Sequence, residues 1–327
     1  MNLKEIGEFG FIDRIAARTV PGSGVALGIG DDAAAIIPVP GLQTLITTDM
    51  LVEGVHFELS FTTPSELGRK SLAVNLSDIA AMGGKPRFAL LSLAVPPGLP
   101  LEFLDAFIGG FISRAERYGV ALIGGDTCAS RSGFVVSVTL IGEQRPDRVV
   151  RRSGARPGDR VYVTGTLGDA ALGLELLRRG ERDGAAVNRH LDPLPRTEAG
   201  LALAEARVPT AMIDVSDGLL ADLGHILRQS GFGAAVFLDR LPLSPEYLNR
   251  ICDLSDDRFA LALSGGEDYE LLFTSPADRE EEVLALFNSP ALPVALIGEI
   301  TSAPGLALIA PDGVPYTPKS FGFNHFT

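Results

Sequence analysis

Alternating hydrophobic and polar segments run along the whole chain and predict strands and helices in alternation. Apolar runs of strand length occur at 25–29, 33–37, 42–48, 88–95, 120–123, 134–141, 161–164, 211–215, 234–239, 271–274, 294–297 and 306–309. Longer segments with helical spacing occur at 64–82, 101–118, 168–177, 218–229 and 276–287. This alternation is typical of an α/β or α+β fold.

The segment 64–82 carries the clearest helix signals. Thr63 is a good N-cap, Pro64 suits the first helical position, and Gly83-Gly84 ends the helix. Ser71, Asn75 and Asp78 follow at i, i+4 and i+7 and form a polar stripe. The stripe is short and flanked by Ala and Met, so we expect it to be buried and to face a site.

The rhythm breaks within 143–159, where Pro146, Gly154, Pro157 and Gly158 accompany the basic cluster Arg148, Arg151, Arg152 and Arg156. Such composition is typical of a domain junction. A length of 327 residues also suits about two domains. We therefore predict domains at 1–148 and 149–327, each with its own α/β core.

Composition restricts the function classes. Hydrophobic residues make up 46% and charged residues 21%, which indicates a globular protein. The net charge of −13 argues against nucleic acid as a partner. Cys128 and Cys252 lack metal-ligand spacing, which favours a reducing compartment. The N-terminus lacks a signal-peptide pattern and no apolar run reaches membrane-spanning length, so we expect a cytoplasmic protein without membrane contact.

Acidic residues recur beside glycine or hydroxyl residues, and the expected strands would leave them at strand ends. The instances are Gly30-Asp31-Asp32, Thr47-Thr48-Asp49, Asn75-Leu76-Ser77-Asp78, Gly124-Gly125-Asp126, Asp214-Val215-Ser216-Asp217 and Gly265-Gly266-Glu267-Asp268. Carboxylates gathered in one cleft repel each other unless something neutralises them. Hard divalent cations do so and also bridge to phosphate. Each Asp alone suits a turn or a helix cap, but together they favour a Mg²⁺-dependent enzyme acting on phosphates.

Two familiar phosphate motifs are excluded. Gly84-Lys85 resembles the end of a P-loop, but Pro86 replaces the hydroxyl residue that would bind Mg²⁺. Gly28-Ile29-Gly30-Asp31-Asp32-Ala33 has the spacing of a dinucleotide fingerprint, yet its two carboxylates would repel a pyrophosphate. Any nucleotide must therefore be bound by a motif other than a P-loop or a dinucleotide fingerprint.

Several motifs keep two interpretations when taken singly. Thr47 and Thr48 suit either a cation or ordinary strand propensity. Ser216 could bind a phosphate or act as an N-cap. A lone histidine such as His56 is more often structural than catalytic, and Arg152 could clamp a phosphate or belong to the surface.

Taken together, the motifs resemble those of the thiamine-monophosphate kinase family. The matching stretches are Gly28–Ala33, Thr47–Asp49, Gly54–Phe57, Ala73–Gly83, Leu122–Thr127, Arg152–Asp159, Ile213–Gly218, Leu263–Leu271 and Gly322–Phe326. They cover nearly the whole chain, and their number and order carry more weight than any single motif.

The resemblance implies the fold shared with aminoimidazole ribonucleotide synthetase. In that fold an N-terminal α/β domain binds ATP and metal and joins its sheet to a dimer mate, and a C-terminal α/β domain completes the site. It also implies transfer of the γ-phosphoryl group of ATP to thiamine monophosphate, giving thiamine diphosphate. The implied cofactors are several Mg²⁺ ions with ATP as co-substrate, and the implied assembly is a homodimer.

The resemblance also assigns residues. The implied metal ligands are Asp32, Thr47, Thr48, Asp49, Asp78, Asp126, Asp214 and Asp217. The implied nucleotide contacts are Gly125, Arg152 and Ser216, and the implied contacts of the thiamine compound are His56, Glu267 and Phe323. The acceptor is an ionised phosphate and needs no general base, so no catalytic base is named. Glu267 suits a cationic ring and Phe323 a flat one.

Other functions remain as alternatives. A selenophosphate synthetase would place a reactive Cys or selenocysteine near its N-terminus, but the first 127 residues here hold no Cys. A hydrogenase-maturation relative would end in Cys, whereas this sequence ends in Asn324-His325-Phe326-Thr327. Aminoimidazole ribonucleotide synthetase remains possible, but it fits the region Thr47–Phe57 poorly. A two-metal phosphohydrolase would release inorganic phosphate. A non-catalytic acidic metal-binding protein would not turn over ATP.

Overall fold

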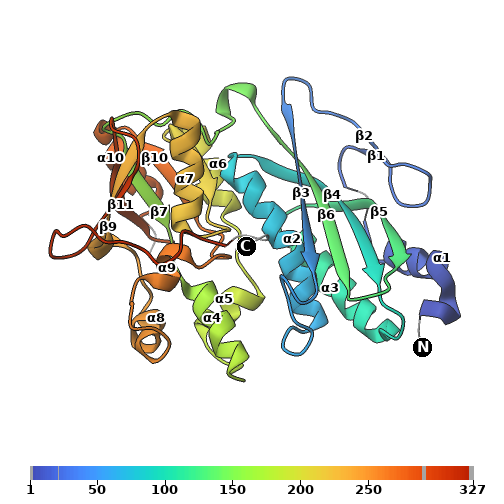
Figure 1. Ribbon diagram of the computed structural model, residues 1–327. Helices are drawn as coiled ribbons and strands as arrows, with labels where there is room; N and C mark the ends of the chain where they lie inside the picture. Colours follow the sequence, from blue (N-terminus) through green and yellow to red (C-terminus); the bar gives the residue numbers. More distant parts are fainter. Residues whose placement is uncertain (1–2, 21, 289–291, 324–327) are drawn as a thin grey trace. The chain divides into compact units, whose positions relative to one another are not determined.

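The computed structural model describes residues 3–20, 22–288 and 292–323. The chain divides into two compact units (Figure 1). The first unit comprises Met1–Ile79 and Gly84–Asp147, and the second comprises Ala80–Gly83 and Arg148–Thr327. Independent folding of the predicted domains 1–148 and 149–327 stays a prediction.

The first unit combines a mixed sheet with helices. Its helices are α1 (Leu3–Ala16), α2 (Pro64–Ala81, whose last two residues belong to the second unit) and α3 (Leu101–Arg117). Its strands are β1 (Val25–Leu27), β2 (Ala35–Ile36), β3 (Gln43–Val52), β4 (Lys85–Val95), β5 (Ala121–Ala129) and β6 (Val135–Gln144). The order in the main sheet is β3-β6-β4-β5, parallel only between β4 and β5, while β1 and β2 form a separate antiparallel pair.

The two faces of the main sheet have different surroundings. Along β3, Leu45 and Leu51 are buried, whereas Ile46 and Met50 are 69% and 57% exposed. This alternation follows from the period of two in a strand. The buried face lies against α2, because a Cβ at Gly142 of β6 would come 3.0 Å from the Ile79 side chain, and Leu45 and Ile79 both border Gly84. The sheet therefore has one face covered by helix and a second face, called here the open face, that is exposed along the edge strand β3. Farther across the sheet, Val25 and Ile36 pack against Phe88 on this second face.

Helix α2 begins as its sequence predicts. The main-chain N–H of Thr63 donates to the Glu66 carboxylate at 2.8 Å, and the N–H of Glu66 donates to the Thr63 hydroxyl at 3.3 Å. This reciprocal pair is a capping box, which satisfies amide groups that the first helical turn leaves unpaired. The predicted N-cap at Thr63 is confirmed. The stripe residues Ser71 and Asn75 are buried, as expected.

The second unit is built on a largely antiparallel sheet. Its strands are β7 (Arg160–Thr164), β8 (Ala211–Asp214), β9 (Gly233–Phe237), β10 (Leu271–Ser275), β11 (Val294–Thr301) and β12 (Leu306–Ile309). They lie in the order β12-β9-β11-β7-β10-β8, and only β12 and β9 run parallel. Its α-helices are α4 (Asp169–Arg178), α5 (Ala185–Leu191), α6 (Thr197–Ala206), α7 (Leu219–Ser230), α8 (Pro245–Arg250), α9 (Ala260–Ser264) and α10 (Glu280–Leu286).

The core of the second unit includes a segment from early in the chain. Tyr162 and Phe273 stack with ring centroids 5.3 Å apart. Ala80 and Ala81 belong to the same buried cluster as Leu203. A Cβ at Gly200 would lie 2.1 Å from the Ala80 carbonyl oxygen, so close packing here requires glycine.

Some predicted boundaries were wrong. Asp49 and Asp126 lie inside β3 and β5 rather than beyond strand ends, because the ladders continue past both residues. Helices α1, α5, α6, α8 and α9 were not predicted. None of the helices in the described part of the chain has the length and hydrophobicity needed to cross a membrane.

Candidate functional site

Three of the predicted metal ligands meet where β3 faces α2. Thr47 and Asp49 share a face of β3 because they are two residues apart. The Thr47 hydroxyl donates a hydrogen bond to Oδ2 of Asp78, which lies on the last turns of α2. The capping box of α2 and the alternation of β3 thus bring Thr47, Asp49 and Asp78 together.

The electrostatics of this group favour a cation. Burial, with the charge of Asp78 as a second cause, raises the pKa of Asp49 to about 7. Two carboxylates and a hydroxyl supply only oxygen donors, which suit Mg²⁺. No group of three or more His, Cys, Asp or Glu side chains arranged to hold a metal occurs among the described residues. Phosphate oxygens and water would have to complete the coordination.

The structure does not bring the other first-unit ligands to this point. Thr48 lies on the opposite face of β3, where its hydroxyl donates to the Val138 carbonyl at 3.1 Å. Asp126 is aligned across the sheet with Ser92 of β4, which is in turn aligned with Ser137 and Met50. Residues aligned in this way share a face, so Asp126 lies on the open face. Asp32 lies in the exposed loop between β1 and β2.

Gly125 and His56 have local geometries that constrain their predicted roles. A Cβ at Gly125 would lie 1.8 Å from the Leu91 carbonyl oxygen, so β5 passes β4 there too closely for any side chain. His56 accepts the Val52 N–H at Nδ1 over 3.1 Å, which places the proton of the neutral ring on Nε2. This bond orients the imidazole at the end of β3.

In the second unit, the predicted residues gather at the turn between β8 and α7. The N–H groups of Ser216, Asp217 and Gly218 all donate to Oδ2 of Asp222, at 3.0, 3.1 and 3.1 Å. Asp222 lies in the first turn of α7 and is buried. The main-chain amides that could have bound a phosphate are therefore already occupied, which leaves the Ser216 hydroxyl for that role.

The same turn concentrates negative charge. Asp214 ends β8 and is buried, and Asp217 follows three residues later. Burial, followed by the charges of Asp214 and Asp217, raises the pKa of Asp222 to about 8. Asp222 was not predicted as a site residue. It holds the turn that carries two of the predicted metal ligands.

Two of the three predicted substrate contacts, Glu267 and Phe323, adjoin this turn. The Glu267 N–H donates to the Ser216 carbonyl at 2.8 Å, and the Phe323 N–H donates to the Asp217 carbonyl at 2.9 Å. Arg152 lies near α7, because its charge contributes, after burial and Arg228, to lowering the pKa of His225. Residues 324–326 of the last matching motif lie outside the described residues.

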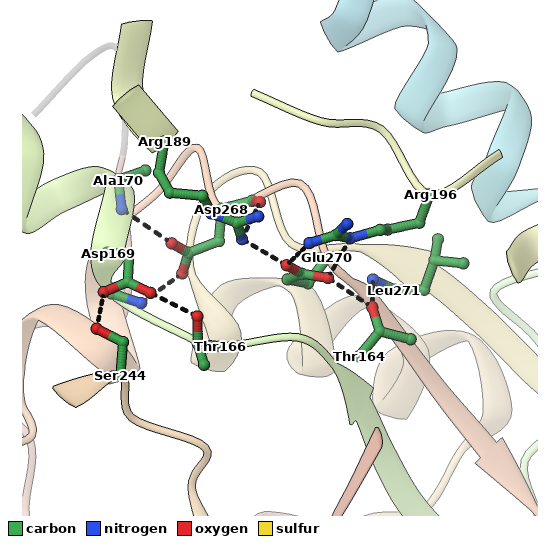
Figure 2. Close-up of polar contacts among 11 residues, drawn as sticks. Thr164, Thr166, Asp169, Ala170, Arg189, Arg196, Ser244, Asp268, Glu270 and Leu271 are labelled. Atoms are coloured by element: carbon green, nitrogen blue, oxygen red, sulfur yellow. Dashed lines mark hydrogen bonds and ion pairs between the residues drawn. The ribbon is translucent and has the colours of Figure 1, made fainter. Parts of the chain in front are cut away.

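The segment that carries Glu267 is held by a buried polar network (Figure 2). Asp268 accepts the N–H groups of Gly168 and Ala170, at 2.7 and 3.2 Å, and so caps α4. Burial raises its pKa to about 7. Glu267 and Tyr269 both have positive φ angles, of 69° and 50°. Side chains rarely adopt this conformation, so the segment depends on its fixed neighbours.

Glu270 is the centre of that network. Its carboxylate accepts hydrogen bonds from Arg189, Arg196 and Thr164, and it is fully buried. Burial opposes its ionisation, but the charges of Arg189 and Arg196 outweigh burial and lower its pKa. An ionised, fully bonded Glu270 fixes the start of β10 directly after Glu267–Tyr269.

Sequence reasoning missed this network. Asp268 and Glu270 lie within a recognised motif. Two acidic residues at alternate positions just before a buried strand could have indicated buried ion pairs. Arg189 and Arg196 carried no comparable signal, because α5 is short and both arginines lie far from Glu270 in sequence.

Two family models match the chain. The AIR synthase related protein N-terminal domain matches residues 30–144, and the AIR synthase related protein C-terminal domain matches residues 156–311. Together they span most of the described chain.

Curated relatives match over nearly their full lengths. The chain is 41% identical over 334 residues to thiamine-monophosphate kinase of Salmonella typhimurium, covering 98% of both chains. It is 38% identical to thiamine-monophosphate kinase of Aquifex aeolicus, covering 100% of both.

Solved structures agree. The thiamine-monophosphate kinase structure from Stenotrophomonas maltophilia K279a has a TM-score of 0.84 and 40% identity, covering 95% of this chain and 98% of that one. A structure described as AaThiL complexed with AMPPCP and TMP has a TM-score of 0.77 and 36% identity, covering 100% and 99%.

Proposed function

We propose that this chain, which belongs to the thiamine-monophosphate kinase family, phosphorylates thiamine monophosphate with ATP. The products are thiamine diphosphate and ADP. The observation that carries the proposal is similarity of 38–41% identity that extends over 98% or more of the chain and of its relatives. A relative that matches over 100% of this chain and 99% of its own was solved with AMPPCP and TMP, which stand for ATP and the acceptor.

The reaction is a direct transfer between phosphates. The bond from the γ-phosphorus to the β–γ bridging oxygen breaks, and its electron pair leaves with ADP. A new bond forms from the γ-phosphorus to an oxygen of the acceptor phosphate. Since that oxygen is already ionised at neutral pH, the chain supplies positioning and charge stabilisation rather than a base.

A cation would be held in the first unit by Asp49, Asp78 and Thr47, and there it would neutralise charge on the transferring phosphoryl group. The pKa of Asp49, raised to about 7, supports this assignment, because two neighbouring buried carboxylates favour a counter-ion. The remaining proposed ligands are Thr48, Asp32 and Asp126 in the first unit, and Asp214 and Asp217 in the second.

The other roles follow the family motifs. Ser216, Arg152 and Gly125 are proposed to contact the nucleotide, with Gly125 allowing close approach of the backbone. The half-exposed ring of Phe323 suits stacking on a flat heterocycle. Glu267 is proposed to face the cationic thiazolium, and His56 to contact the acceptor.

We further propose a homodimer joined through the open face of the first-unit sheet. The exposed Ile46 and Met50 on an edge strand support it, because such apolar surface favours association. Light scattering after chromatography should give twice the chain mass for the wild type and the monomer mass for Ile46→Asp/Met50→Asp. Val314→Asp, a change at an exposed second-unit residue, should leave the mass unchanged.

The decisive experiment for the reaction is incubation with ATP, Mg²⁺ and thiamine monophosphate. We expect thiamine diphosphate to form in step with ADP, without excess inorganic phosphate. ATP carrying a chiral γ-phosphate should deliver it with inversion. Phosphate release without phosphorylated acceptor would indicate a hydrolase, and retention of configuration would indicate a phosphoenzyme.

A further inference from the structure

Helix α5 contacts the substrate-facing segment through two successive side chains. Arg189 donates to the buried Glu270 carboxylate and, at 3.3 Å, to the Asp268 carbonyl. His190 places its Nδ1 3.1 Å from Oε2 of Glu267. One short helix thus contacts Glu267, Asp268 and Glu270, within and directly after the segment that holds the strained residues Glu267 and Tyr269.

His190 and Glu267 differ in exposure in an informative way. The His190 side chain is 3% exposed, whereas that of Glu267 is 23% exposed. The imidazole therefore supports one carboxylate oxygen from the protein side, and part of the carboxylate remains accessible to a ligand. A buried partner that restricts a partly exposed carboxylate is the arrangement by which a binding group is pre-organised.

We propose that His190 is a positioning residue that orients the Glu267 carboxylate toward a cationic ring of the phosphate acceptor, and so contributes to selecting that acceptor. This inference rests on the proposed function. The buried imidazole nitrogen, 3.1 Å from one carboxylate oxygen, restricts the rotamers open to Glu267, so that less order is lost when the ring binds.

The experiment compares His190→Leu, which keeps volume but removes the donor, with His190→Asn, whose amide nitrogen replaces Nδ1. For His190→Leu we expect the KM for thiamine monophosphate to rise about tenfold, because Glu267 loses the close polar contact that restricts its carboxylate. The kcat and the KM for ATP should stay within about twofold. His190→Asn should recover most of the acceptor KM.

Two further measurements separate positioning from general damage. An acceptor whose thiazolium is replaced by an uncharged thiophene ring should bind the wild type and His190→Leu equally. In a double-mutant cycle, Glu267→Gln combined with His190→Leu should be no worse than Glu267→Gln alone. Glu181→Gln, in a surface pair with Arg250 just before α5, is the control expected to change neither constant.

Several results would overturn the inference. These are an unchanged acceptor KM in His190→Leu, an equal loss for charged and uncharged acceptors, additive effects in the cycle, or a collapse of kcat. If His190→Leu does not fold, His190→Asn and Glu267→Gln carry the same comparison. Calorimetric Kd values for thiamine monophosphate keep the test separate from turnover, so failure of the wild type to make thiamine diphosphate would count against the proposed function alone.

Discussion

The hydroxyl of Thr47 on β3 donates a hydrogen bond to the carboxylate of Asp78 on α2. The bond joins a strand and a helix that are separate in sequence, at the point where Asp49 also lies. It offsets part of the repulsion between the two carboxylates, because the hydroxyl places a donor against one oxygen of Asp78.

Replacing Thr47 by valine should therefore impair catalysis more than folding. We expect kcat/KM to fall about tenfold, or roughly 1.4 kcal/mol of transition-state stabilisation, because Asp78 loses its donor. Thr47→Ser keeps the hydroxyl and should stay within about threefold of wild type. Steady-state kinetics at saturating Mg²⁺ would test this, and equal activity of Val and Ser variants would contradict it.

Asp49→Asn should have a larger effect. We expect kcat/KM to fall at least about a hundredfold, or roughly 2.7 kcal/mol, because one anionic ligand of the cation is lost. The metal-free variant should be no less stable than the wild type, since a buried carboxylate next to Asp78 becomes neutral. Turnover at the wild-type rate would reduce Asp49 to a structural residue.

Removal of divalent metal should abolish both phosphoryl transfer and tight ATP binding, because the acidic side chains would otherwise face the triphosphate without neutralisation. Calorimetry with ATP in EDTA and in Mg²⁺ measures the difference. Adenosine, which has no phosphate, serves as the control whose weak binding should not depend on metal. Undiminished ATP affinity in EDTA would refute the proposal that bound cations mediate ATP binding.

Glu270→Gln should strongly destabilise the second unit. The change leaves the partly buried Arg189 and Arg196 beside each other without their fully buried carboxylate partner, and breaking a buried pair costs about 3–5 kcal/mol. Glu299→Gln breaks the half-exposed pair with Arg160 and should cost less than about 1 kcal/mol. Urea unfolding of both variants tests the contrast, and similar losses would show that Glu270 is not the centre of the network.

The Asp268 carboxyl should make stability depend on pH. Its folded-state pKa of about 7 exceeds the ordinary value of 3.8, so the folded state binds the proton more tightly. That contribution is complete below about pH 4 and is lost as the pH rises toward 7. The unfolding free energy of wild type relative to Asp268→Asn should therefore fall between pH 5 and pH 8, by on the order of 1–2 kcal/mol. A constant difference would contradict this.

Features set by neighbouring residues could be predicted from the sequence. Helix α2 begins and ends close to the expected positions because Thr63, Pro64 and Gly83 act within a few residues of the helix ends. The strands of both sheets were also located, because each contains an apolar run of strand length or an alternation of apolar and polar residues that can be read from the sequence.

Features that depend on the folded chain could not be predicted. Asp222 receives three N–H groups only because the turn before α7 folds back over it. Arg189 and Arg196 reach Glu270 across the unit, and no local pattern marks that pairing. By contrast, the separation of Thr47 and Thr48 onto opposite faces was implicit in the predicted strand 42–48, because successive side chains of a strand alternate between its faces.

The placement of Ala80–Gly83 in the second unit has a consequence for synthesis on the ribosome. These residues emerge early, whereas Leu203 and Phe273, which belong to the same core cluster, emerge much later. The second core therefore cannot close while the first half of the chain is being made. We expect this short apolar segment of the nascent chain to lack its packing partners until Phe273 has been made, a period in which chaperones would have access to it.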